Sequence, residues 1–457
     1  MKIQLSAALA ALIGLAGAAH AEDPVLKFEK YTLENGLEVI LHQDNSVPIV
    51  AVNVWYHVGS GDEDPGKTGF AHLFEHMLFQ GSEHVGEDRH FALLKEIGAT
   101  GVNGTTNTDR TNYFEVVPSN QLETGLWLES DRMGYFLSLV TKKSLDNQIE
   151  VVRNERRQRT DNAPYGKTWM KQFETLYPKG HPYHFWIIGD HADLAGASLE
   201  DVKNFYRKWY VPANATLALS GDFEIAEAKR LVKKWFGSFP KSTKPTIKVA
   251  KTPLIAEPIR VELEDSLAKH RRVDYLWHSP KRYEDGDAEL SILADALGRT
   301  GTGRLYKILV HEKQLAQSIS IFQYSRAYGS AFHLEVKLKP TADQAEVEKI
   351  VNDELERIRR EAIKKEEFDR AVTNVEAGFV WGLESVNARA NILQTYNHYW
   401  ANPDGITRDL DRYRKSSTEK VRAAAARYLG SKNRVTVVTK PGATSAAGRP
   451  KAAAKGK

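Results

Sequence analysis

One short stretch of this chain holds side chains suited to metal-dependent hydrolysis. His72 and His76 are four residues apart, and Glu75 lies between them in the pentapeptide HLFEH. On an α-helix, residues i, i+3 and i+4 share one face, so both imidazoles can reach a single metal ion with the carboxylate beside them. A carboxylate placed there can take a proton from a water molecule. The spacing H-x-x-E-H is that of an inverted zinc-hydrolase motif.

This pentapeptide needs a third ligand, because catalytic zinc usually has three protein ligands and one open position. Histidine and glutamate are common residues, so the pattern can also arise by chance. Residues 144–159 predict a downstream helix, which begins with the capping residue Ser144 and has apolar residues at helical spacing. Glu155 lies in this helix among four arginines. The residues alone allow either a metal ligand or a surface glutamate paired with arginine.

Length and composition predict a globular protein with a sizeable core. The chain has 457 residues, 42% of them hydrophobic and 27% charged, which favours two or more domains. The formal net charge of +4 is too small to suggest a nucleic-acid partner. There are no cysteines, which excludes disulfides and cysteine chemistry and suits an oxidising compartment.

The two ends of the sequence differ in composition from the rest. Residues 1–21 are typical of a secretory signal, with Lys2, an apolar run over 5–15 and a cleavage pattern that ends at Ala21. No later segment approaches the ~18 consecutive apolar residues of a spanning helix. We therefore expect a periplasmic or secreted protein with no membrane span after signal removal. Residues 441–457 predict a disordered basic tail.

The chain repeats itself at a distance of 219 residues. Residues 198–214 match 417–433, and each copy is typical of a capped helix followed by a strand. The same offset places Ser291, Ala294 and Asp295 opposite the HLFEH residues. Self-similarity over this distance predicts duplicated domains. Only the first of the two copies can hold a metal ion at this helix.

Each half has the pattern of an α+β domain. In the first half, alternating apolar residues turn at Asn35-Gly36, a hairpin signal, and a third strand is predicted over 49–58. We expect two duplicated domains, each a mostly antiparallel sheet packed against helices, that close like a clam shell. The predicted bounds are 22–240 for the metal-bearing domain, 241–258 for a Pro/Thr/Lys-rich linker and 259–440 for the domain without metal.

From about Phe28 to Lys440 the chain resembles the M16 metallopeptidases, the pitrilysin/insulinase family, and most closely its short two-domain type. The resemblance is carried by GFAHLFEHMLFQG from Gly69, GVNGTTNTDRTNYF from Gly101, VVRNERRQR from Val151 and HPY from His181. It implies one zinc ion per chain, held by the two motif histidines and Glu155, with Glu75 as the general base.

The resemblance also assigns a role to the segment around Asn103. In the family this segment is an edge strand that pairs with the substrate backbone, which implies peptide contacts by Asn103, Gly104 and Thr105. Edge-strand pairing grips an extended peptide without reading its sequence. Taken alone, the same residues favour a polar turn.

Two positions depart from the family pattern. Gln148 stands seven residues before Glu155, where the family often has an acidic residue. It is our candidate for a residue that contacts the ligand side chains and orients them without binding the metal itself. Val310 and Gln317 stand where many members carry an Arg and a Tyr that contact the bound peptide. In heterodimeric members that pair comes from a homologous chain, so the departure implies an M16 partner subunit.

These observations predict a zinc-dependent endopeptidase that cleaves extended or unfolded peptides in the periplasm, as the metal-bearing chain of a heterodimer. The alternatives are a non-catalytic M16-like subunit of a larger assembly and a different metal-dependent hydrolase on the same scaffold. A non-catalytic fate usually comes with degraded ligands, whereas all three ligands and the base are present. The cluster His181, His184 and His191 lacks a metal-binding pattern, and His84 and His90 are predicted to face solvent.

Overall fold

The computed structural model describes residues 23–247, 252 and 254–442. The signal segment predicted over 1–21 lies outside the described residues. So do residues 443–457 of the predicted tail and residues 248–251 and 253 of the predicted linker.

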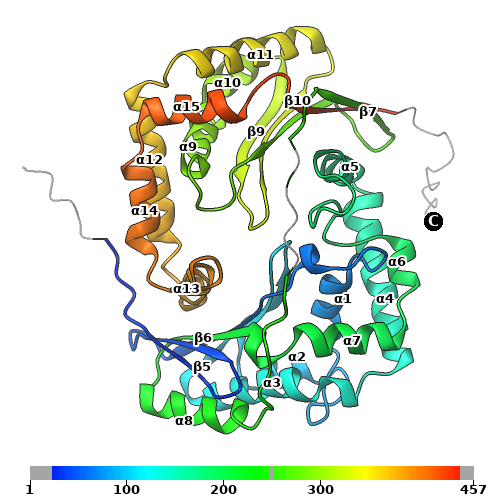
Figure 1. Cartoon of the computed structure of the whole chain (residues 1–457), viewed down its shortest axis with the longest axis vertical. Coiled ribbons are helices and arrows are strands. Elements are labelled where there is room, and N and C mark those ends of the chain that lie inside the picture. Colours follow the sequence, from blue (N-terminus) through cyan, green and yellow to red (C-terminus); the bar gives the residue numbers. More distant parts are fainter. Residues whose placement is uncertain (1–22, 248–251, 253, 443–457) are drawn as a thin grey trace, which may run out of the picture.

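Two mixed sheets form the framework of the molecule (Figure 1). The first has six strands in the order β1-β2-β6-β3-β5-β4, and the second has five in the order β7-β11-β8-β10-β9. Within each sheet one pair is parallel, β2 with β6 and β7 with β11, and the other pairs are antiparallel. The first sheet comprises β1 (Glu29–Thr32), β2 (Glu38–Gln43), β3 (Ile49–Tyr56), β4 (Thr100–Thr106), β5 (Thr111–Pro118) and β6 (Ala215–Gly221). The second comprises β7 (Ile259–Asp265), β8 (Arg272–Ser279), β9 (Ala316–Tyr324), β10 (Ser330–Leu338) and β11 (Val435–Pro441).

Fifteen helices surround the sheets within the described residues. Those of the first half are α1 (Phe70–Met77), α2 (His90–Glu96), α3 (Leu122–Tyr135), α4 (Lys142–Arg156), α5 (Gly166–Leu176), α6 (His191–Ala195), α7 (Leu199–Trp209) and α8 (Ile225–Phe236). Those of the second are α9 (Asp287–Gly298), α10 (Arg304–Tyr306), α11 (Gln344–Arg360), α12 (Lys365–Trp381), α13 (Val386–Trp400), α14 (Ile406–Arg414) and α15 (Thr418–Tyr428).

The strand orders confirm the duplication. From β2 to β4 and from β7 to β9, both sheets run through equivalent strands in the same sequence, with the parallel pair at the same place. The repeated segments form α7 and α15, whose N-caps are Ser198 and Ser417. The predicted hairpin is also present, since β1 pairs with β2 around Gly36, whose φ of 98° favours glycine.

The helix that carries Glu155 starts earlier than predicted. Its N-cap is Thr141, and Ser144 is the third helical residue. The two residues form a reciprocal cap, because each side chain accepts a hydrogen bond from the backbone N–H of the other. The predicted N-cap, Ser144, was therefore three residues too late, although Ser144 does take part in the cap.

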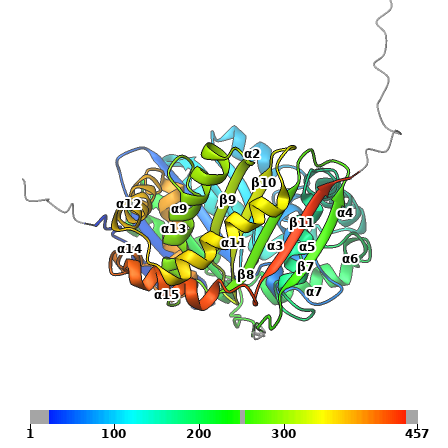
Figure 2. The same ribbon diagram turned by 90° about the horizontal axis from the view of Figure 1, so that it is seen from above.

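The first core lies between one face of the first sheet and α1, α3, α4, α7 and α8. It contains Val39, Val52, Phe74, Val152 and Val202, all of them fully or almost fully buried. The second core has the same construction on the second sheet. Figure 2 shows α11 crossing that sheet on the outer side of the molecule.

Each half contributes one helix to the sheet of the other. Helix α13, from the second half, packs Ala390 and Leu393 against Ala51 and Ala218 of the first sheet. Helix α5, from the first half, belongs to a cluster with β8 and β11 of the second sheet. Figure 1 shows α13 over β6 and α5 beside the second sheet. The predicted α+β fold of two duplicated, closed halves is confirmed.

Candidate metal centre

Helix α1 is positioned by its N-terminus and by its apolar face. The Glu63 carboxylate accepts hydrogen bonds from the N–H groups of Gly69 and Ala71, both at 2.8 Å, and so satisfies donors that a helix start leaves free. Burial raises the pKa of Glu63 well above its usual value. Phe70 and Phe74 are buried in the first core, so the histidine face of the helix points the other way.

The structure brings the three predicted ligands together. One ligand atom each from His72, His76 and Glu155 lies within 4.8 Å of the others, and no other such group occurs among the described residues. Glu155 Oε2 is 3.2 Å from His76 Nε2 and 3.6 Å from His72 Nε2. Two ligands of a tetrahedral zinc, each about 2.1 Å from the ion, are about 3.4 Å apart.

The donor atoms of this group fit a metal ion. Glu155 Oε2 is buried and has no hydrogen bond from the described residues, although two imidazole nitrogens are close to it. Buried polar atoms normally have a partner, and a metal ion would supply it here. The other carboxylate oxygen is 2.7 Å from Arg159 Nη1. The nearby His76, together with His72 and Arg159, lowers the pKa of Glu155.

His72 has the charge state that metal binding requires. Burial and the neighbouring His76 lower the pKa of His72 to about 4. The imidazole is therefore neutral near pH 7 and has a lone pair to donate.

Glu75 lies beside the ligands, under the strand β4. Thr106 Oγ1 donates a hydrogen bond of 2.6 Å to Glu75 Oε2. Burial raises the pKa of Glu75, which brings the carboxylate closer to the range of a general base near neutral pH. The sequence reasoning missed Thr106. Its signal was the period of two in a strand, which puts Thr106 on the same face as Gly104.

Strand β4 can approach α1 closely because Gly104 has no side chain. A Cβ atom at this position would lie 2.8 Å from Glu75 Cγ and 3.0 Å from Phe79 Cε2. Real Cβ atoms do not tolerate the first of these separations, so another residue here would push the strand and the carboxylate apart. The glycine therefore fixes the spacing between β4 and the base.

The edge position predicted for the Asn103 segment is present. Strand β4 is the last strand of the first sheet and pairs only with β5. Asn103 is exposed, while Thr105 is half-buried, with its hydroxyl hydrogen bonded to Asn112 Oδ1 at 2.5 Å. Its carbonyl oxygen accepts a hydrogen bond of 2.8 Å from Arg110 Nη1, so both oxygens of Thr105 already have partners.

A cavity of 620 Å³ opens next to the three ligands. Its volume is in the range of small-molecule and peptide-binding clefts. The lining residues include Asn103, Gly104, Thr105 and Thr106 from β4, and Trp169 and Trp186 on another side. All of the lining residues come from the first half of the chain.

Three candidate positions lie away from direct contact with the ligands. Gln148 is buried on α4, but among the described residues its amide has no hydrogen bond to a predicted ligand. Val310 is partly buried against the second core. Gln317 is exposed on β9, the edge strand of the second sheet. Neither Val310 nor Gln317 lines the metal cavity.

The remaining histidines have partners other than a metal group. His184 Nδ1 is 2.7 Å from the carbonyl oxygen of Tyr177, and His191 Nε2 is 2.8 Å from Asp161 Oδ2. The His84 side chain is half exposed, as predicted. The prediction for His90 was wrong: it is buried, because its ring hydrogen bonds with Arg132 and packs edge-on against Phe79.

The equivalent place in the second half has different side chains. Helix α9 presents Ser291 and Asp295 where α1 has its histidines. Asn374, which stands 219 residues after Glu155, donates a hydrogen bond of 3.2 Å to Asp295 Oδ2. An amide and a carboxylate thus satisfy each other at the place that two imidazoles and a carboxylate occupy in the first half.

Both halves match known family descriptions. Residues 38–168 match the family model for Insulinase (Peptidase family M16), and residues 196–375 match that for the Peptidase M16 inactive domain. The chain belongs to the peptidase M16 family. The M16 resemblance seen in the sequence motifs is thereby confirmed.

Relatives in this M16 family are named as proteases. The chain is 29% identical over 391 residues to the zinc protease PqqE of Helicobacter pylori, covering 84% of this chain and 86% of that protein. The crystal structure of a protease from Helicobacter pylori superposes with a TM-score of 0.85 and 27% identity, covering 91% of this chain and all of that one. The periplasmic protease PqqL of Escherichia coli shares the fold, with a TM-score of 0.75 and 16% identity over 92% of this chain and 48% of that one.

Proposed function

We propose that this protein is a zinc-dependent endopeptidase that cleaves extended or unfolded peptides. The observation that supports this most directly is the convergence of His72, His76 and Glu155 beside Glu75, under an edge strand. Relatives named as zinc proteases support the same metal and reaction class. The ligand set holds one ion per chain, because the counterpart in the second half has lost its histidines.

The residues of the centre divide the work of peptide hydrolysis. His72, His76 and Glu155 would hold the zinc ion, and a bound zinc supplies Lewis-acid activation of water and of the scissile carbonyl. Glu75 accepts the proton of the attacking water and passes it to the leaving amine. Thr106 holds the Glu75 carboxylate in place through its hydrogen bond of 2.6 Å.

The substrate would bind as an added strand on β4. The free edge offers main-chain donors and acceptors from Asn103 to Thr105, close to the ligands. A peptide must be extended to use them, which favours unfolded segments over folded domains. In this arrangement Asn103 and the backbone of Gly104 and Thr105 grip the peptide, while Glu75 faces the scissile bond.

We further propose that the chain works with a homologous M16 subunit. In its own second half, Val310 and Gln317 replace the Arg and Tyr that would contact substrate, and every residue that lines the metal cavity comes from the first half. A partner that closes over this side would supply the missing donors. A donor aimed at a developing oxyanion can stabilise the transition state by about 3 kcal/mol.

The proposed compartment is the periplasm. Residues 1–21 have the composition of an export signal, and one protein of the same fold is named a periplasmic protease. Among the described residues, no helix has the length and apolar character needed to cross a membrane. We assign residues 22–240 and 259–440 to the metal-bearing and metal-free domains, joined by the linker 241–258.

The decisive experiment combines metal analysis with digestion of a peptide library by the purified full chain. We expect one zinc per chain and cleavage of unstructured peptides that ceases when a chelator removes the metal and returns when zinc is restored. The Glu75→Gln variant should contain the metal but cleave the same peptides far more slowly than the wild type. A chain that binds no metal and cleaves no peptide, alone or with a co-expressed homologue, would refute the proposal and favour a non-catalytic subunit.

A further inference from the structure

Three positively charged side chains line a second cavity at the junction of the two halves. The cavity has a volume of 280 Å³, and Lys244, Lys281 and Arg282 all lie on its wall. Glu284 is the only carboxylate among its lining residues. The cavity therefore has an excess of positive charge in a partly enclosed place.

These three cations have no carboxylate partner among the described residues. None of the ion pairs among the described residues involves Lys244, Lys281 or Arg282. Arg282 Nη2 donates to the carbonyl oxygen of Ser325 at 3.1 Å, and its buried Nε has no partner. The Glu284 carboxylate accepts a hydrogen bond from the backbone N–H of Lys281 at 3.2 Å and so braces the loop.

Lys244 is exposed, while Lys281 and Arg282 are half-buried. The Arg282 guanidinium also lies over the rings of Tyr399 and Tyr283. An anion that enters the cavity would meet all three cations without displacing a carboxylate from any of them.

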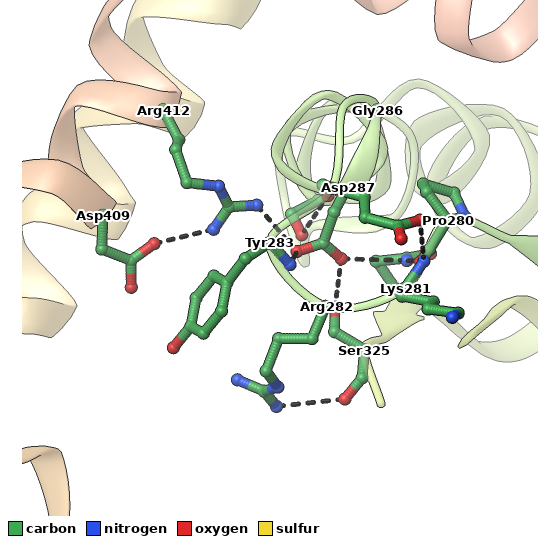
Figure 3. Close-up of polar contacts among 12 residues, drawn as sticks. Pro280, Lys281, Arg282, Tyr283, Gly286, Asp287, Ser325, Asp409 and Arg412 are labelled. Carbon is green, nitrogen blue, oxygen red and sulfur yellow. Dashed lines mark hydrogen bonds and ion pairs between the residues drawn. The ribbon is translucent and has the colours of Figure 1, made fainter. Parts of the chain in front are cut away.

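The loop that carries Lys281 and Arg282 is held rigidly by Asp287 (Figure 3). The Asp287 carboxylate accepts hydrogen bonds from the Tyr283 N–H at 2.9 Å and from Gln323 Nε2 at 3.1 Å. Arg412 neutralises it across 2.7 Å. Asp287 therefore shapes the loop, and its own hydrogen bonds and ion pair go to groups other than Lys281 and Arg282. Figure 3 shows the Arg282 guanidinium hydrogen bonded to Ser325.

Two histidines on the same wall experience this positive environment. His57 Nδ1 and His398 Nδ1 are 2.7 Å apart, so one of the two rings donates to the other. Burial lowers the pKa of His398 to about 4, with Lys244 and Arg282 acting in the same direction and Asp109 opposing them. Burial and His398 lower the pKa of His57 as well. Both rings are therefore neutral near pH 7, and the lysines and the arginine provide the charge.

Two of the residues that line the cavity contact the turn that follows β4, the strand proposed to hold the substrate. Asp109 lies in the turn that follows β4, and its Oδ2 accepts hydrogen bonds from the Tyr399 hydroxyl at 2.8 Å and from the Ala327 N–H at 3.1 Å. Tyr399 and Ala327 both line the cavity. A peptide that extends along β4 and past its end would therefore approach this wall, where the acidic side chain of Asp109 lies beside the cations.

We propose that this cavity binds a carboxylate of the peptide substrate, either an acidic side chain or the C-terminal carboxylate. The inference rests on the proposed peptidase function and adds a charge preference to it. Lys281 and Arg282 would hold the carboxylate from the second half and Lys244 from the segment that joins the halves. One charged group would then engage both parts of the molecule and favour the closed arrangement when a suitable peptide is bound.

The test measures peptide binding rather than turnover. The full chain with Glu75→Gln is titrated with one fluorescent, unstructured peptide in four forms, with Glu or Gln at one position away from the cleavage site, and with a C-terminal acid or amide. We expect the peptide whose carboxylate enters the cavity to bind about tenfold more tightly than its neutral counterpart. This is the size of one charge-assisted contact at a partly exposed site. The Glu/Gln pair reports a side-chain source and the acid/amide pair a terminal one.

Variants then assign the preference to the cavity. Lys281→Met and Lys244→Met should each reduce it severalfold, and Arg282→Met should abolish it. Lys349→Met is the matched control, since this exposed lysine on α11 pairs with Asp353 outside the cavity. If Arg282→Met does not fold, the two lysine variants still decide the matter. Equal binding of all four peptides, or a preference that survives both lysine variants, would overturn the proposal.

This result is separable from the peptidase proposal. A chain that prefers carboxylates but, with Glu75 restored and zinc bound, cleaves no peptide would keep the anion site and refute the peptidase function. A chain that cleaves peptides but binds acid and neutral forms equally would refute the anion site alone.

Discussion

The hydrogen bond between Thr106 and Glu75 offers the most specific test of the catalytic geometry. Thr106→Val removes the hydroxyl while keeping the size and branching of the side chain. The bond is 2.6 Å long and reaches a partly buried carboxylate, so its loss should cost about 1.5–3 kcal/mol. If half or more of that loss is felt in the transition state, kcat/KM should fall about tenfold.

The same substitution should change the pH profile in a defined direction. The Thr106 hydroxyl stabilises the ionised form of Glu75, which burial opposes. Without the hydroxyl, the pKa of Glu75 rises further, and the acidic limb of kcat/KM moves to higher pH because the base must be deprotonated to act. Activity should therefore fall most at acidic pH and partly recover in more alkaline buffer.

Steady-state kinetics on one quenched fluorescent peptide over a pH series would measure both effects. Thr106→Ser restores the hydroxyl and should regain most of the activity. Thr105→Val is the matched control, since it removes a hydroxyl from the same strand that bonds Asn112 rather than Glu75. Zinc content should be unchanged in all three variants. If Thr106→Val showed the kcat/KM and pH profile of the wild type, the assignment of Thr106 as the residue that positions the base would be wrong.

Four further outcomes follow from the site. Alanine at His72, His76 or Glu155 should abolish stoichiometric zinc by metal analysis while circular dichroism stays near wild type, and full zinc in Glu155→Ala would exclude it as the third ligand. Glu75→Gln should keep the metal and lose ~10²-fold or more in rate, which single-turnover kinetics can measure. Gly104→Ala should impair activity more than thermal stability, because the added Cβ would lie 2.8 Å from Glu75 Cγ and displace that side chain. Co-expression with an M16 homologue should raise kcat/KM, whereas high activity from a strict monomer that the homologue leaves unchanged would contradict the heterodimer.

Local periodicity in the sequence was enough to predict much of the fold and part of the site. The spacing of His72, Glu75 and His76 requires them to share a face once the segment is helical, whatever the rest of the molecule does. The hairpin at Asn35-Gly36 follows likewise from the backbone conformation that glycine permits. The duplication was visible because equivalent positions at the ends of both halves kept similar residues over 219 positions.

Assignments that depended on contacts between distant segments were less secure. His90 looked like a surface residue, but Arg132 and Phe79 enclose it. Periodicity placed Glu155 on a helix without deciding between a metal ligand and an arginine partner. The structure gives it both neighbours, two imidazoles at one oxygen and Arg159 at the other.

What the sequence by itself determined is the set of chemical groups and their spacing within single helices and strands, because those depend on residues a few positions apart. Tertiary structure alone decided which groups meet. It placed the Thr106 hydroxyl within hydrogen-bond distance of Glu75 and packed α5 and α13 each against the sheet of the other half. It also placed three cations without an ion-pair partner among the described residues on the wall of one cavity. The physical reason is that the packing of the two cores fixes these separations, and no local pattern records a distance between segments that are far apart along the chain.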